Sequence, residues 1–127
     1  MSIWLPKMAD VLLLHTKLTA RSGGSDGIRE AGLIESALAR ASVAFGGMEA
    51  YPDAISKAAA AGCGLAQNHG FIDGNKRIGV MTMLLILRRN SIALSYTQAE
   101  LTDVGMGIAR GEMDVPDVLD WIKAHLS

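Results

Sequence analysis

Two adjoining segments decide what this chain can fold into. The first, 69–77, packs an imidazole, a carboxylate, two glycines, an amide and two cations into nine residues, and the second, 78–87, is almost entirely hydrocarbon. A polar segment fits directly before an apolar one when it forms a loop at the N-terminus of a buried helix. The apolar run is about half as long as the ~20 residues that a membrane helix needs, so it predicts a core helix and no membrane partner.

Composition favours a helical domain. The 127 residues suit a single domain, 1–127, and Ala, Leu, Ile and Met carry the hydrophobicity, with only two residues each of Phe, Trp and Tyr. A net charge of −1 argues against a strongly basic surface, so we expect no direct nucleic-acid partner. The single cysteine, Cys63, excludes an internal disulfide and is expected in the core. The first residues lack a signal-peptide pattern, and a cytoplasmic protein is therefore expected.

Apolar periodicity and capping signals predict about six helices in a compact all-α bundle. The clearest boundary is that of the fifth helix, where Thr97 precedes the helical pattern and Glu100 completes a capping box. Gly46 and Gly47 are expected to end the second helix, and residues 91–96 are expected to be extended or irregular. The predicted helices span 4–21, 31–45, 51–68, 74–89, 98–110 and 116–126.

The segment 69–77 has the chemistry of a phosphate site. A helix that begins at Gly74 or Asn75 leaves its first N–H groups unpaired, and those groups favour an anion. Lys76 and Arg77 add two cations at the same helix end. Cations there are unfavourable unless an anion such as a phosphate neutralises them, so a phosphate ligand is expected.

Three other side chains complete the predicted site. Asp73 adds a carboxylate beside the phosphate position, where a Mg²⁺ ligand of a bound triphosphate belongs. His69 precedes it by four residues, and histidine is the side chain best suited to act as a base near neutral pH. Phe71 alternates with the polar groups, so we expect it to point inward and anchor the loop.

The segment resembles the signature loop of the Fic/Doc family, whose pattern is His-x-Phe-x-Asp/Glu-Gly/Ala-Asn-x-Arg. Members that transfer AMP usually have a glycine before the arginine and a second arginine three residues after it. This chain has Lys76 and Val80 at those positions, as the Doc (death-on-curing) branch does, and the resemblance extends to stretches within 23–40 and 84–90. The fixed positions are all matched, by His69, Phe71, Asp73, Gly74, Asn75 and Arg77.

The resemblance implies a type II toxin that transfers the γ-phosphate of ATP, with Mg²⁺, to a Ser or Thr hydroxyl of a protein target. In Doc toxins the target is understood to be elongation factor Tu, so that translation stops. The implied roles are proton removal by His69, Mg²⁺ binding by Asp73, and ATP phosphate binding by Gly74, Asn75, Lys76 and Arg77.

A docking flap and an inhibitor are also implied by the resemblance. Many Fic proteins are inhibited by their own Ser/Thr-x-x-x-Glu-Gly/Asn helix, but no glutamate in this chain is followed by glycine or asparagine. Inhibition is therefore expected from an antitoxin protein that supplies a segment in trans. The glycine-rich loop is the expected flap for the target, through Gly23, Gly24, Gly27 and Arg29.

Other interpretations are open at this point. The chain could be a Fic-type AMP transferase, against which Lys76 and Val80 argue, or a non-catalytic module that binds an antitoxin. The plain alternative is an ordinary polar loop that caps a helix. Of the other histidines, His15 is expected to be packed or bonded to the backbone, and His125 to lie on the surface near the C-terminus.

Overall fold

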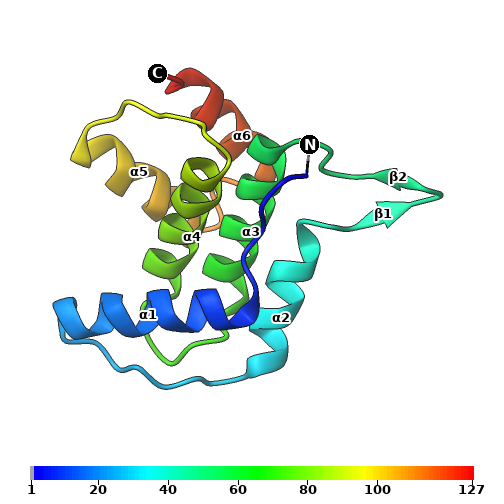
Figure 1. Ribbon diagram of the computed structural model, residues 1–127. Coiled ribbons are helices and arrows are strands. Elements are labelled where there is room, and N and C mark those ends of the chain that lie inside the picture. The colour runs from blue at the N-terminus through cyan, green and yellow to red at the C-terminus, as the bar shows by residue number, and fades with distance from the viewer. Residues whose placement is uncertain (1) are drawn as a thin grey trace.

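The computed structural model describes residues 2–127, which form six helices and one short antiparallel hairpin (Figure 1). The predicted all-α bundle is confirmed. No helix in this part of the chain is both long and apolar enough to cross a membrane. In chain order the elements are α1 (Met8–Ser22), α2 (Ala31–Arg40), β1 (Ala44–Phe45), β2 (Met48–Glu49), α3 (Ala54–Asn68), α4 (Asn75–Arg89), α5 (Gln98–Ala109) and α6 (Val115–Ala124).

Helices α3 and α4 form the centre of the molecule. They stand side by side in Figure 1, with α1 lying across one end and α6 at the other. Every residue of α3 from 56 to 66 is buried, and most of these are Ala or Gly. Such small side chains let α4 approach so closely that a Cβ added to Gly79 would lie 2.5 Å from the main-chain oxygen of Gly62. The loop between the two helices therefore leaves from a closely packed pair.

Substituting alanine for Gly79 is expected to destabilise the fold by about 1–3 kcal/mol, because the added methyl group overpacks a contact between two backbones. The matched control is Gly32→Ala, since nothing lies within 4 Å of a Cβ built at Gly32 in α2. That change should stabilise the protein by about 0.5–1 kcal/mol. Urea unfolding of both variants checks the pair, and equal effects would contradict the close packing of α3 on α4.

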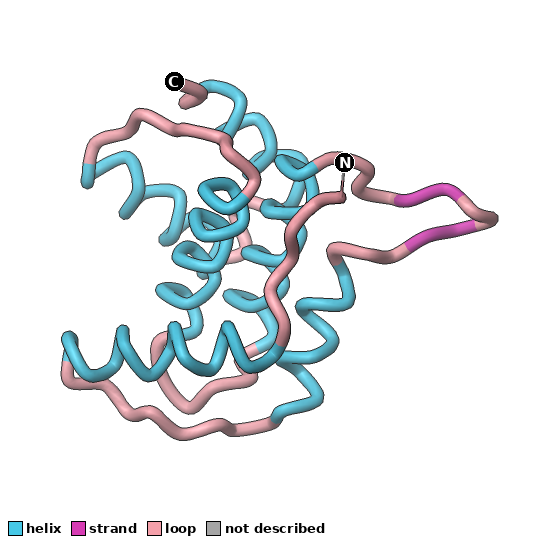
Figure 2. Tube along the Cα trace, viewed as in Figure 1, coloured by secondary structure: helices cyan, strands magenta, loops and turns pink. Residues whose placement is uncertain are grey.

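The second helix is shorter than the sequence predicts. The prediction extended it to residue 45, but α2 ends at Arg40 and the chain turns into the β1–β2 hairpin, which projects from the bundle (Figure 2). Gly46 and Gly47 both have positive φ, at 57° and 81°, which suits the two central residues of a tight hairpin turn. The two glycines therefore connect strands and do not end a helix.

The first helix begins at Met8, later than the predicted residue 4. The main-chain groups of Trp4 bond to the side-chain amide of Asn90 and not to a helix. The amide accepts from the Trp4 N–H and donates to the Trp4 carbonyl, both at 2.9 Å. These bonds hold the chain at Trp4 against the C-terminal end of α4. The fifth helix follows its prediction closely, since Thr97 and Glu100 form the expected capping box.

His125 was predicted to lie on the surface near the C-terminus; it is half-buried there and has specific partners that the sequence did not reveal. Its ring stacks on Trp121 with centroids 4.2 Å apart, and its Nε2 lies 2.8 Å from Glu100 Oε2. Hydrogen bonds from the main chain of Thr97, and then from His125, lower the pKa of Glu100 to about 2. The bond to the Trp121 carbonyl, and then that to Glu100, raises the pKa of His125. The C-terminus is thus clasped to the start of α5.

The clasp should make stability depend on pH in a defined window. The contribution of Glu100 is present above its ordinary pKa of 4.5 and is lost as the pH falls towards 2. That of His125 is present below its ordinary pKa of 6.5 and is lost as the pH rises through its raised pKa. We expect His125→Gln to lower the urea midpoint more at about pH 6 than at about pH 9. A difference between the two proteins that stays constant with pH would contradict this.

Candidate active site

The signature loop joins α3 to α4 at the end of the bundle that α1 crosses. Two residues with left-handed backbones mark its limits. His69 ends α3 with φ 54° and ψ 46°, and Gly74 precedes α4 with φ 77°. The His69 side chain is exposed, and the first turn of α4 begins directly after Gly74.

The glycine-rich loop between α1 and α2 lies alongside the signature loop. The Gly70 carbonyl accepts from the N–H groups of Arg29 and Glu30, at 2.8 and 2.9 Å, and the Ile72 N–H donates to the Gly27 carbonyl at 2.9 Å. Ile28 and Phe71 form an antiparallel bridge between the two loops. Segments about forty residues apart in the sequence are therefore joined by their main chains.

The four predicted flap residues differ in what they contact. Arg29 points at the signature loop, since its Nε donates to the His69 carbonyl at 2.7 Å. Gly24 lies against the predicted metal ligand, where an added Cβ would come within 2.8 Å of Asp73 Oδ2. Gly27 packs under Ile72, whereas Gly23 ends α1 with φ 78° and has no neighbour within 4 Å of a built Cβ. Three of the four thus face the signature loop.

Asn75 closes the signature loop on itself. Its Oδ1 accepts from the Phe71 N–H and its Nδ2 donates to the Phe71 carbonyl, both at 3.0 Å. The Phe71 ring is only 2% exposed. The Asn75 amide was predicted to bind phosphate, and its polar atoms are engaged with the loop's own backbone, so its contribution to the site is to hold the loop in shape.

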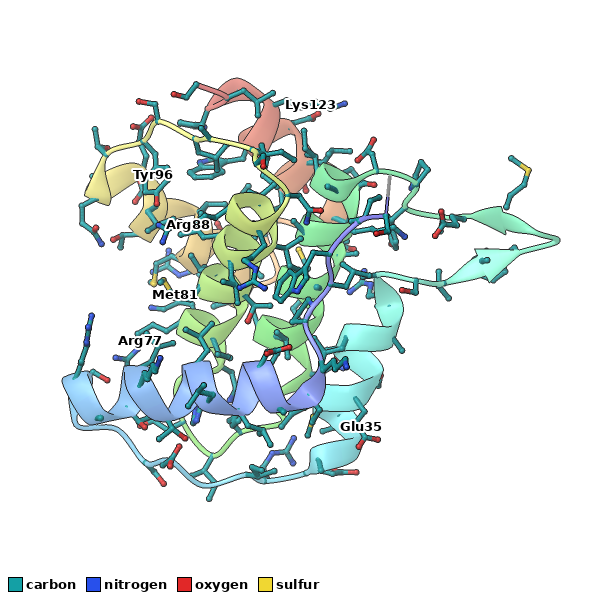
Figure 3. The ribbon with its side chains drawn as sticks, viewed as in Figure 1. Glu35, Arg77, Met81, Arg88, Tyr96 and Lys123 are labelled. Atoms are coloured by element: carbon teal, nitrogen blue, oxygen red, sulfur yellow. The ribbon has the colours of Figure 1, made fainter. Side chains whose placement is uncertain are left out.

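Two cations stand at the start of α4 without a carboxylate partner. Within residues 2–127, the ion pairs found include neither Lys76 nor Arg77. Lys76 runs along Gly105 of α5, and its Nζ lies 3.4 Å from the sulfur of Met106, while Arg77 is exposed. Figure 3 shows Arg77 near Met81 on the same side of α4. Two free cations at a helix N-terminus make a strong attraction for an anion.

Asp73 is the acidic group of the loop. Its Oδ1 accepts from the Gly74 N–H at 2.9 Å, and its Oδ2 has only a long contact of 3.4 Å with the Ser25 N–H. Residues 2–127 contain no cluster of three or more His, Cys, Asp or Glu that could bind a metal by themselves. One exposed carboxylate beside a helix start that carries two cations is compatible with Mg²⁺, which is commonly held by one or two carboxylates together with substrate phosphates.

Sequence comparison with known proteins identifies the family of this chain. The sequence profile of the Fic/DOC family matches residues 5–87, which include both loops and the helices that carry them. This chain belongs to the Fic/DOC family. It is similar to "Protein kinase doc" of Escherichia phage P1, with 33% identity over 90% of this chain and 89% of the relative. It is also similar to "Toxin Doc" of Mycolicibacterium smegmatis, with 37% identity over 94% of this chain and 93% of the relative.

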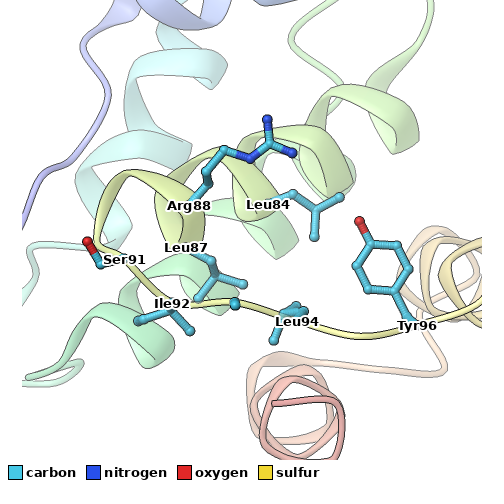
Figure 4. Close-up of a pocket in the computed structure, with 8 residues that line it drawn as sticks. Leu84, Leu87, Arg88, Ser91, Ile92, Leu94 and Tyr96 are labelled. Atoms are coloured by element: carbon cyan, nitrogen blue, oxygen red, sulfur yellow. The ribbon is translucent and has the colours of Figure 1, made fainter. Parts of the chain in front are cut away.

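A cavity of about 320 Å³ adjoins the two cations of this Fic/DOC chain. Its walls come from α1, α4 and α5, and most are apolar. A larger cavity, of about 410 Å³, lies at the opposite end of α4 and involves Arg88 and Tyr96 (Figure 4). Only the smaller one touches residues of the signature loop. It is lined by Leu18, Lys76, Arg77, Val80, Met81, Gln98, Leu101, Thr102 and Gly105.

Two features of this Fic/DOC site could not be assigned from the sequence. Arg29 was expected to dock a target, and its contact with the His69 carbonyl came to light only in three dimensions. His15 was expected to be packed or backbone-bonded, which is confirmed, but its partner in the signature loop was not foreseen. The available signal was a polar residue on the buried stripe of α1, between Val11 and Thr19.

Cys63 is buried as expected, and burial raises the pKa of its thiol to about 12.

Proposed function

We propose that this chain is the toxin of a type II toxin–antitoxin system and transfers the γ-phosphate of ATP to a Ser or Thr hydroxyl of a protein. The observation that carries the proposal is the pair of cations, Lys76 and Arg77, that start α4 without a carboxylate partner in residues 2–127. An ATP polyphosphate is an anion of the size and charge that this helix start can neutralise. Two relatives of this chain, one named as a protein kinase and one as a toxin, support the proposed phosphate transfer by a toxin.

The residues of the loop divide the chemistry among them. His69, exposed at the end of α3, takes the proton of the attacking hydroxyl. Asp73 would hold Mg²⁺, which would screen the phosphate charges. Lys76, Arg77 and the first amides of α4, including that after Gly74, hold the phosphate oxygens and stabilise charge that develops in the transition state. Catalysis of this kind consists mainly of positioning and electrostatic stabilisation.

Lys76 supports γ-phosphate transfer over AMP transfer. A glycine at this position would leave open space between α4 and α5. Here the lysine stem fills that space, with its Cγ 3.6 Å from a Cβ built at Gly105, and it forms part of the cavity wall. Val80, which also lines the cavity, supplies no second guanidinium group. A nucleotide would therefore have to bind with its phosphates placed differently from those in an AMP transferase.

The partners follow from the same proposal. The protein substrate is a translation factor, by resemblance elongation factor Tu, and the reaction takes place in the cytoplasm. An antitoxin supplies the inhibitory segment that this chain lacks. Its docking place is the cavity beside the signature loop, where Leu18, Met81 and Leu101 provide apolar contacts and Arg77 provides a charge at the rim. A segment with apolar and acidic side chains would fit it.

Labelled ATP separates the candidate functions. The purified chain, Mg²⁺ and a bacterial extract are incubated with ATP labelled at either the α or the γ phosphate, and proteins are separated on a gel. We expect a labelled protein band from γ-labelled ATP only. A band from α-labelled ATP would replace the kinase by an AMP transferase. If neither label is transferred while an active relative labels its target in parallel, the chain is a binding module.

A further inference from the structure

His15 reaches the signature loop from α1, outside the family's signature motif. The side chain is only 1% exposed. Its Nε2 lies 2.7 Å from the main-chain oxygen of Asp73, and its Nδ1 lies 3.3 Å from Asp26 Oδ1 in the glycine-rich loop. Its ring lies flat on Phe71, with centroids 3.7 Å apart and an interplanar angle of 13°. One buried ring thus contacts both loops.

The partners of the ring dictate how it bonds. A peptide carbonyl can only accept a hydrogen bond, so Nε2 of His15 must donate to Asp73. The Thr16 hydroxyl donates its one hydrogen to the Asp26 carboxylate, whose two oxygens lie 3.0 and 3.2 Å away, and this holds the carboxylate beside the helix. The His15 ring is therefore held at one edge by the Asp73 carbonyl and on its face by Phe71, while its Nδ1 lies beside the Asp26 carboxylate.

The bond to Asp73 lies at the point where the loop becomes α4. The peptide between Asp73 and Gly74 is bonded on both sides. Its carbonyl accepts from His15 Nε2, and its N–H, that of Gly74, donates to Asp73 Oδ1. Gly74 has a left-handed backbone, and a Cβ built there would lie 3.5 Å from His15 Nε2. Rotation of this peptide would turn the Asp73 carboxylate and shift the first amides of α4 together.

We propose that His15 is a positioning residue, which orients the peptide between Asp73 and Gly74 and so aims the Asp73 carboxylate at the metal–phosphate position. The inference rests on the proposed function, because Asp73 matters only if the chain binds a nucleotide with Mg²⁺. The competing explanation is that His15 merely fills space under Phe71. The two explanations differ in whether the Nε2 donor matters separately from the packing of the side chain.

Two amide substitutions separate the donor from the packing. In His15→Gln the side-chain nitrogen comes near the position of Nε2 and can still donate to the Asp73 carbonyl. In His15→Asn the nitrogen comes near the position of Nδ1, and the bond to Asp73 is lost. Both variants lose the aromatic stack on Phe71, so both should be destabilised, and the comparison is made well below their unfolding temperatures after circular dichroism confirms the fold.

The transfer assay gives the first readout. We expect His15→Asn to lower kcat by about tenfold to a hundredfold, because a small misplacement of a binding group has effects of that size. It should also raise the Mg²⁺ concentration needed for half-maximal rate. His15→Gln should stay within about threefold of the wild type on both measures. Equal losses in the two variants, or no loss in either, would overturn the proposal.

Nuclear magnetic resonance gives a readout that needs neither ATP nor Mg²⁺. Because both variants lose the ring current of His15, they are compared with each other: the carbonyl ¹³C resonance of Asp73 should lie further from its wild-type position in His15→Asn than in His15→Gln. In the wild type, the His15 ring should show a slowly exchanging Nε2–H. A ring that carries its only proton on Nδ1 would refute the inference, even if His15→Asn does not fold. Should the wild type transfer no phosphate, the proposed function fails while these spectra still decide the role of His15.

Discussion

Replacing His69 by asparagine is expected to lower the rate of γ-phosphate transfer by about 10²–10⁴-fold, the range over which a general base acts. Asparagine cannot accept the proton of the attacking hydroxyl at neutral pH. The fold should be nearly unaffected, because the His69 side chain is exposed and Arg29 binds only its main-chain oxygen. Asparagine is chosen since it tolerates the left-handed backbone of this position, with φ 54°, better than alanine does.

The His69 variant is checked by initial rates with γ-labelled ATP and by urea unfolding. His69→Gly serves as the matched variant, because glycine removes the imidazole and is free of strain at positive φ. Both variants should be equally slow while keeping urea midpoints close to that of the wild type. If either transferred phosphate at the wild-type rate, the assignment of His69 as base would be abandoned, whichever phosphate is transferred.

Replacing Lys76 by methionine should lower the transfer rate by about 10²–10³-fold, the cost of removing one preorganised group that stabilises transition-state charge. Methionine keeps a long apolar stem, so the contact with Gly105 and the neighbouring Met106 can be retained. The loss should therefore appear in catalysis with little change in stability. Because no carboxylate within residues 2–127 pairs with Lys76, no acidic partner is left unpaired by the change.

The control for this substitution is Lys123→Met on α6. Lys123 is exposed and lies at the opposite end of the bundle from the signature loop (Figure 3). The Lys123→Met substitution removes the same charge from the protein without changing the site, so the transfer rate of this variant should equal that of the wild type. A common loss in both variants would point to a general effect of net charge, and an unchanged rate for Lys76→Met would remove this lysine from the phosphate site.

The sequence predicted those parts of the fold that depend on neighbouring residues. The capping box of Thr97 and Glu100 is complete within four positions, and it located the start of α5 correctly. The apolar run after the signature loop was correctly assigned to a core helix. In each case the signal and the structure that it specifies lie within one or two helical turns.

The contacts that the sequence could not predict join distant segments. The bond from His15 to Asp73 spans 58 positions, and the amide of Asn90 holds Trp4 across 86 positions. The end of α2 was predicted wrongly because a Gly-Gly pair can either stop a helix or turn a hairpin. The chain on both sides of that hairpin is bound by Lys57 of α3. Its Nζ, on a buried side chain, donates to the Ala41 carbonyl and to Glu49, at 2.9 and 2.7 Å. The spacing of residues in the sequence does not predict such distant partners.

The pairing of the glycine-rich loop with the signature loop has a consequence for biosynthesis. The signature loop takes its shape from main-chain bonds to residues 27–30 and from a ring in α1, and its far end is the first turn of α4. A nascent chain that lacks α4 cannot bury α3, so it has no stable support for the loop. Ribosomes that stall or release the chain early would therefore produce fragments without an ordered signature loop. The signature loop can therefore take its final shape only after α3 and α4 have both been synthesised and have packed against each other.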